Sequence, residues 1–149
     1  LRSLKGLLPF DSFDLVTCNP PYETAGSGFL SANPAHQIAR HELCCTIEDV
    51  CQTASQLLKT GGRFCLCHRP GRLTDVLTAM RRHRLEPKRL RFVAKDEHSA
   101  PWLFLAEGKK DAKPSLEVMP TLFISGQKGA PSAELREIYG LDSGKDVTT

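Results

Sequence analysis

The sequence lacks the features that would indicate a membrane-spanning or secreted protein. Its 149 residues contain no apolar run near the roughly 18 residues that a membrane-spanning helix needs. The first residues, Leu1 to Lys5, lack the long apolar core of a signal peptide. No internal repeat is visible, and the net charge of +3 by itself indicates little about a polyanionic partner. With 40% hydrophobic and 25% charged residues, the composition is that of a globular protein, which we expect to be soluble and cytoplasmic.

The sequence also has no Cys-x-x-Cys pair, a spacing typical of metal and redox sites. Its six cysteines lie in or beside apolar segments, where small thiols are common in reduced proteins. A zinc site made by Cys65, Cys67 and His68 is the alternative, but alternate strand residues supply no tetrahedral fourth ligand. We therefore predict reduced cysteines and no metal.

Apolar and alternating segments predict five strands. The first and fourth are apolar runs, the third alternates basic with apolar residues, and the last contains a proline that suits a sheet edge. The short loop between the third and fourth strands predicts that they form an antiparallel pair. The predicted strands are 13–18, 63–68, 88–94, 101–106 and 116–124.

Two further segments have the periodicity of amphipathic helices. The first begins at a capping box formed by Thr46 and Asp49, and Gly61-Gly62 is predicted to end it as a C-terminal cap. The second carries apolar residues from Leu73 to Met80 on one face and is predicted to end at Glu86-Pro87. The order strand, helix, strand, helix, strand, strand predicts an α/β fold.

The stretch with the most specific chemistry is Asn19-Pro20-Pro21-Tyr22, directly after the first predicted strand. Two prolines form a rigid, extended exit from a strand, at the sheet edge where open α/β sheets bind ligands. The Asn19 side-chain oxygen and the Pro20 carbonyl are two acceptors, which match the two hydrogens of an exocyclic amine on a nucleobase. Tyr22 can stack on the base. The alternative is an ordinary turn with a buried tyrosine.

Residues after this tetrapeptide are candidates for substrate contact. The segment from Glu23 to Gly28 is either a lid over the substrate or a plain connector. Phe29 is a candidate for substrate binding. Arg40 and His41 are candidates to hold a phosphate or the base, with an ion pair at a helix start as the alternative.

Basic residues gather between positions 81 and 95, where Glu86 is the single acid. Such a stripe predicts contact with the phosphates of RNA, and we take Arg82 and Arg89 as substrate-binding candidates. The alternative is a solvated helix end and edge strand. The stripe consists of Arg81, Arg82, Arg84, Lys88, Arg89, Arg91 and Lys95.

These segments resemble a known family. Phe13 to Tyr22 is similar to motif IV of the class I S-adenosylmethionine-dependent amino-methyltransferases, which methylate adenine, guanine or glutamine nitrogens. The resemblance implies a Rossmann-like fold, S-adenosyl-L-methionine as cofactor with Asn19 among its contacts, and Asn19, Pro20, Pro21 and Tyr22 as the catalytic residues. Later segments resemble the bacterial tRNA1(Val) adenine-37 N6-methyltransferases, which implies a tRNA partner: Ile38 to Glu42, Leu58 to Phe64, Arg69 to Leu73, and Leu85 to Arg91.

One part of that family's pattern is absent from the sequence. The donor-binding Gly-x-Gly turn after a first strand is not found, and Gly26-Ser27-Gly28 follows the tetrapeptide and so cannot take that role. We therefore expect residues 1–125 to be the C-terminal part of a methyltransferase domain, from its fourth strand onward, with a polar, partly disordered tail over residues 126–149.

Such a chain is expected to bind S-adenosylmethionine poorly and to be inactive alone. Three alternatives stay open: a glutamine-amide methyltransferase, a guanine-amine methyltransferase, and a non-catalytic remnant that binds RNA or a partner protein.

Overall fold

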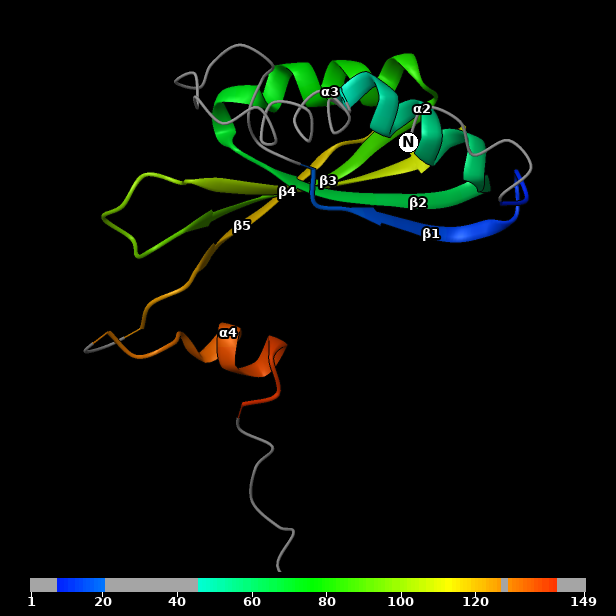
Figure 1. The fold of residues 1–149 in the computed structure, drawn as a ribbon. Helices are drawn as coiled ribbons and strands as arrows, with labels where there is room; N and C mark the ends of the chain where they lie inside the picture. The colour runs from blue at the N-terminus through cyan, green and yellow to red at the C-terminus, as the bar shows by residue number, and fades with distance from the viewer. Residues whose placement is uncertain (1–7, 21–45, 127–128, 142–149) are drawn as a thin grey trace, which may run out of the picture.

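A mixed five-stranded sheet forms the centre of the molecule (Figure 1). The computed structural model describes residues 8–20, 46–126 and 129–141. The strands are β1 (Phe13–Cys18), β2 (Leu58–His68), β3 (Leu85–Ala94), β4 (Leu103–Lys110) and β5 (Glu117–Phe123). The helices are α2 (Ile47–Leu57), the 3-10 turn η1 (Pro70–Arg72), α3 (Leu73–Arg82) and α4 (Ala133–Ile138).

The sheet has the spatial order β1-β2-β4-β3-β5. Strands β1 and β2 are parallel, whereas β4 runs antiparallel to both of its neighbours, β2 and β3. Strand β5 pairs in parallel with β3 at the edge of the sheet. The predicted α/β architecture, the antiparallel pair and the edge position of the last strand are thereby confirmed.

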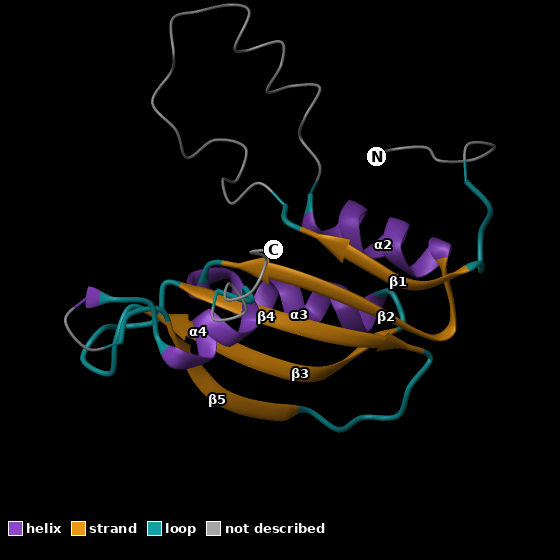
Figure 2. Cartoon of the chain, turned by 90° about the horizontal axis from the view of Figure 1, so that it is seen from below, coloured by secondary structure: helices purple, strands orange, loops and turns teal. Residues whose placement is uncertain are grey.

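Helices α2 and α3 pack side by side on one face of this sheet (Figure 1). Their apolar faces meet alternate strand residues, and Phe64, Phe104 and Met80 are completely buried between the two layers. The periodicity that predicted both helices therefore identified the correct buried faces. On the other side of the sheet lies the short helix α4, where Glu134 pairs with Arg91 of β3 at 2.6 Å (Figures 1 and 2).

The end predicted for the first helix is wrong. Its start is confirmed, because Thr46 and Asp49 form the expected capping box, but the helix ends at Leu57 and β2 begins at the next residue. Gly61 and Gly62 instead lie inside β2, where the pairing register with β1 shifts: Phe13 pairs with Leu58, but Leu15 pairs with Arg63. Gly61 has φ +80°, a conformation that favours glycine.

The end predicted for the second helix is also wrong. Helix α3 ends at Arg82, and the reversal into β3 is made by Arg84, which has a positive φ of 62°. Pro87 lies inside β3, at a point where the pairing register with β4 shifts. A proline without an N–H is tolerated at such a bulge, so this Glu-Pro pair is part of a strand.

The predicted polar tail contains one helix in its described part. Ser132 caps α4 by accepting a hydrogen bond from the Leu135 N–H. Before this helix, Pro131 forms an isolated antiparallel bridge with Ser125, which follows β5.

Candidate functional site

The site begins where β1 and β2 end next to each other. Cys18 is paired with Leu66 in these parallel strands, so Asn19 leaves β1 beside Cys67 of β2. The Cys67 thiol donates a hydrogen bond to Asn19 Oδ1, with an Sγ to Oδ1 distance of 3.1 Å. Asn19 is exposed, and the adjoining Pro20 is buried. The structure thus presents an amide to solvent at the carboxyl edge of a parallel strand pair, as predicted for a ligand site in an open sheet.

Several predicted site residues lie outside the described part of the chain. These are Pro21 and Tyr22 of the tetrapeptide and the substrate candidates Phe29, Arg40 and His41, as well as the candidate lid from Glu23 to Gly28. Their roles stay predictions.

His68 lies at the end of β2, one residue beyond Cys67. Its side chain is buried and stacks on Phe104, with ring centroids 6.4 Å apart. The Arg69 N–H donates to His68 Nδ1 at 2.9 Å, so a neutral ring carries its proton on Nε2. Burial, assisted by the nearby charge of Arg72, lowers the pKa of His68 below its ordinary value. His68 is therefore a neutral residue of the core.

The zinc alternative finds no support in the described residues. Among residues 8–20, 46–126 and 129–141, no group of three or more His, Cys, Asp or Glu side chains is arranged to hold a metal ion. His68 faces the helix layer with Phe104, whereas Cys65 faces the other side of the sheet, toward Glu107. Cys51 and Cys65 are free thiols.

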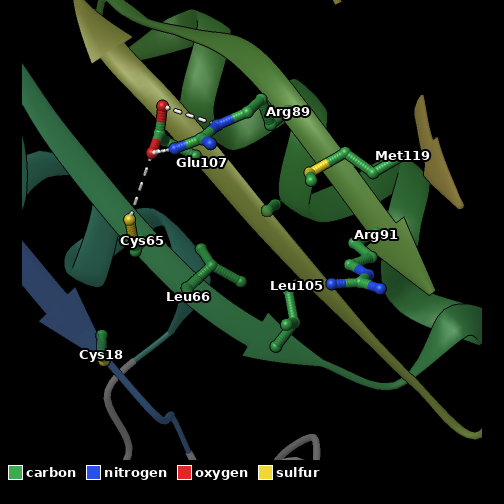
Figure 3. A pocket seen from close by; sticks show the side chains of 9 residues that line it. Cys18, Cys65, Leu66, Arg89, Arg91, Leu105, Glu107 and Met119 are labelled. Atoms are coloured by element: carbon green, nitrogen blue, oxygen red, sulfur yellow. Dashed lines mark hydrogen bonds and ion pairs between the residues drawn. The ribbon is translucent and has the colours of Figure 1, made fainter. Parts of the chain in front are cut away.

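The face of the sheet away from α2 and α3 carries a shallow hollow of about 340 Å³ (Figure 3). Among its lining residues, Arg89 makes a two-pronged ion pair with Glu107, and the Cys65 thiol lies 3.9 Å from the same carboxylate. Burial and the charge of Glu107 raise the pKa of the Cys65 thiol. The hollow is lined by Cys18, Cys65, Leu66, Arg89, Arg91, Leu105, Ala106, Glu107 and Met119.

The two arginines predicted to bind RNA do not lie together. Arg82 ends α3 and pairs with Glu48 of α2 at 3.0 Å, on the helix-covered side of the sheet. Arg89 lines the hollow on the opposite face (Figure 3). The sequence interval 81–95 is thus divided between two faces, and four of its arginines pair with acids from elsewhere in the chain, while Arg81 pairs with Glu86 of the same interval. The ion pairs are Arg81–Glu86, Arg82–Glu48, Arg84–Asp111, Arg89–Glu107 and Arg91–Glu134.

Sequence reasoning missed the contact between Cys67 and Asn19. The strand-helix-strand order could have revealed it, because the two strands of such a unit run in parallel and their carboxyl ends place the following side chains together.

The sequence is similar to curated methyltransferases. It is 32% identical over 105 residues to tRNA1(Val) (adenine(37)-N6)-methyltransferase of Porphyromonas gingivalis, in strains ATCC 33277 and W83. The match covers 70% of this chain and 40% of the relative, so the chain spans less than half the length of these curated relatives. No protein-family model matches the sequence.

The fold is similar to that of solved methyltransferase structures. One is a predicted O-methyltransferase from Agrobacterium tumefaciens, with a TM-score of 0.69 and 20% sequence identity. That similarity covers 99% of this chain and 61% of the other. The chain is thus similar in sequence to curated tRNA1(Val) (adenine(37)-N6)-methyltransferases and similar in fold to a solved methyltransferase.

Proposed function

We propose that this chain supplies the amine-binding side of an S-adenosylmethionine-dependent methyltransferase that acts on the N6 amine of an adenine in tRNA. One observation carries the proposal: the exposed amide of Asn19 stands at the carboxyl end of a parallel strand, directly before Pro20. The named activity of the relatives from Porphyromonas gingivalis supports adenine in tRNA as the substrate. A tRNA substrate would place the enzyme in the cytoplasm.

The proposed roles of these residues are to bind the substrate amine and to stabilise the charge that develops on it. An exocyclic amine is a poor nucleophile because its lone pair is delocalised into the ring, and its nitrogen gains positive charge as it is methylated. Asn19 Oδ1 and the Pro20 carbonyl would accept its two hydrogens and stabilise that charge. Pro20 has no N–H to compete for the same acceptors. Tyr22 would stack on the ring and hold the amine in line with the methyl donor.

The residues of this chain do not account for a methyl-donor pocket. The sequence contains no Gly-x-Gly turn of the required placement, and Asn19 is its one predicted contact with S-adenosylmethionine. We therefore propose that this chain alone binds the donor poorly and is inactive. Titration calorimetry of the 149-residue chain should show no saturable binding of S-adenosylmethionine. Binding at micromolar affinity would refute this part of the proposal.

The acceptor role is tested by methyl transfer from labelled S-adenosylmethionine to unmodified tRNA, using the full natural product of the gene. Asn19→Ala should lower kcat by roughly 10²-fold. This is the usual effect of removing one preorganised hydrogen-bonding group that stabilises charge in the transition state. Thr17→Ala, at an exposed position of β1, is the matched control and should keep normal activity. Unchanged activity of the Asn19 variant would exclude the acceptor role.

The same assay separates the alternative substrates. Transfer to a glutamine-containing peptide or to a guanine amine, with none to adenine, would keep the enzyme class and replace the substrate. No transfer to any of them by the full gene product would favour the non-catalytic remnant.

RNA contact by Arg82 and Arg89 stays a proposal. The Arg82 side chain is 68% exposed and the Arg89 side chain is 45% exposed. Exposed ion pairs are weak, so phosphates can replace the carboxylates that now pair with these arginines. If they bind phosphates, Arg82→Gln and Arg89→Gln should each weaken tRNA binding and reduce its salt dependence. Arg72→Gln, which breaks a local pair with Asp75, is the control.

A further inference from the structure

The thiol of Cys67 contacts the side chain on which the proposed chemistry depends. Its Sγ lies 3.1 Å from Asn19 Oδ1, although the two residues are 48 positions apart in sequence. The pairing of Cys18 with Leu66 places them side by side at the end of β1 and β2. The contact is therefore a product of the sheet register rather than of a flexible loop.

A thiol in this place can fix which way the amide faces. An asparagine side chain has an oxygen that accepts and an NH₂ group that donates, and rotation by half a turn exchanges them. The Cys67 S–H is a donor, so it favours the orientation in which Oδ1 faces β2 and disfavours the flipped one. Because an amide oxygen has two lone pairs, it can accept from the thiol and from an amine hydrogen at the same time.

The other thiol on this part of β2, that of Cys65, has a different partner. Cys65 lies two residues earlier on the same strand, and its thiol contacts the carboxylate of Glu107 at 3.9 Å. Cys65 lines the hollow on the sheet face with Arg89 (Figure 3), whereas Cys67 contacts the amide at the strand end. The chain thus offers a matched control two positions away.

We propose that Cys67 is a positioning residue, whose thiol holds the Asn19 amide with its oxygen oriented to accept the substrate amine. The inference rests on the proposed function, because it assigns Cys67 a task through Asn19. The thiol takes no part in bond making, and no redox step is involved.

The first test compares four variants of the full natural gene product in the methyl-transfer assay. Cys67→Ala removes the donor and should lower kcat by about tenfold while changing the KM for S-adenosylmethionine less than twofold. Cys67→Ser keeps a hydroxyl donor and should stay within threefold of wild-type kcat. Cys65→Ala should keep wild-type kcat, and Asn19→Ala should lose nearly all activity.

The outcomes separate this inference from the proposed function. If Asn19→Ala is inactive but Cys67→Ala has wild-type kcat, the positioning role is wrong and the proposed function stands. Equal losses in Cys67→Ser and Cys67→Ala would show that packing of the sulfur matters rather than hydrogen-bond donation, which also overturns the inference. If Asn19→Ala keeps full activity, the proposed function fails.

A second test needs no activity. In a ¹⁵N-labelled sample, the side-chain NH₂ resonances of Asn19 should shift or broaden in Cys67→Ala and should be unchanged in Cys65→Ala. Unchanged Asn19 resonances in Cys67→Ala would overturn the positioning role whatever the enzyme assay gives.

Discussion

His68 is the buried titratable residue next to the contact between Cys67 and Asn19. Because its folded-state pKa is lowered by burial and by Arg72, the unfolded chain takes up a proton at higher pH than the folded chain does. The stabilising effect of the neutral ring is complete above the unfolded pKa of about 6.5 and is lost as the pH falls below it. Acidification should therefore destabilise the fold through this residue.

We predict that the free energy of unfolding falls between pH 7.5 and pH 5.5, and falls less in His68→Asn, which retains an acceptor for the Arg69 N–H. Urea denaturation at the two pH values measures this difference. His98→Asn, at a position 86% exposed, should keep the wild-type pH dependence. An identical pH dependence in wild type and His68→Asn would show that His68 does not titrate as described.

At the scale of single residues, the sequence predicted which atoms can accept hydrogen bonds, but it did not predict which residues contact one another. The acceptor atoms of Asn19 and Pro20 follow from residue type, and the strand before them follows from an apolar run. The partners of the arginines could not be predicted, because Arg82 finds Glu48 34 positions away and Arg91 finds Glu134 43 positions away. Counting acids only between positions 81 and 95 therefore overestimated the exposed positive charge of that segment.

At the scale of elements, the irregular start of β2 depends on a glycine without a side chain. A Cβ built on Gly62 would lie 2.9 Å from the Lys59 carbonyl oxygen and 3.1 Å from that of Phe13. Both neighbours are backbone atoms, which cannot move aside without disturbing the pairing of β1 with β2. This close approach is the reason why glycine occupies the bulge.

Gly62→Ala should accordingly lower the free energy of unfolding by roughly 1–3 kcal/mol, the usual cost of overpacking. Gly71→Ala is the control, because a Cβ there meets no atom within 4 Å. Chemical denaturation of both variants tests the difference. Equal stability of the two would mean that the bulge adjusts without cost.

Lys110 joins three elements at the end of β4. Its buried Nζ donates to the carbonyl oxygens of Ser55 and Leu58 at 2.6 and 2.8 Å, and it pairs with Asp11 at 2.6 Å. The lysine thereby provides partners for carbonyl groups where α2 ends and β2 begins. No glycine cap is needed there, which explains physically why the predicted cap at Gly61-Gly62 was wrong.

We predict that Lys110→Met lowers the free energy of unfolding by about 2 kcal/mol, because buried acceptors lose their donor. Lys109→Met, at an exposed position one residue earlier, should change it by less than about 0.5 kcal/mol. A stable Lys110→Met protein would indicate that water replaces the ammonium group.

Element order could be predicted from the sequence, whereas element boundaries could not. Apolar spacing identified the buried faces of α2 and α3, since Val76 and Met80 are completely buried. The Gly-Gly and Glu-Pro pairs were interpreted as helix ends because both are common there. In the structure both residue pairs lie in strands, because the segments that contain them pair with neighbouring strands. Strand pairing joins residues that are distant in sequence, so local sequence does not predict it.

At the scale of the whole molecule, the sheet order explains how one short chain holds the proposed site. Strands β1 and β2 run in parallel and end together beside Asn19, while antiparallel β4 separates β2 from β3. The chain covers 40% of the length of its curated relatives. This arrangement is the basis of our proposal that the chain supplies the amine-binding side of the reaction.

No helix in the described part of the chain is both long enough and apolar enough to cross a membrane. Helices α2 and α3 use their apolar faces to cover the sheet, and Figure 2 shows both helices behind its strands.

The most direct test of the central claim is nucleoside analysis, by mass spectrometry, of tRNA from cells in which the gene is deleted. We predict that N6-methyladenosine is lost from tRNA, is restored by the wild-type gene, and is not restored by the Asn19→Ala variant. An unchanged level of N6-methyladenosine in the deletion strain would contradict the assignment to adenine in tRNA. Full restoration by Asn19→Ala would contradict the role of the Asn19 amide.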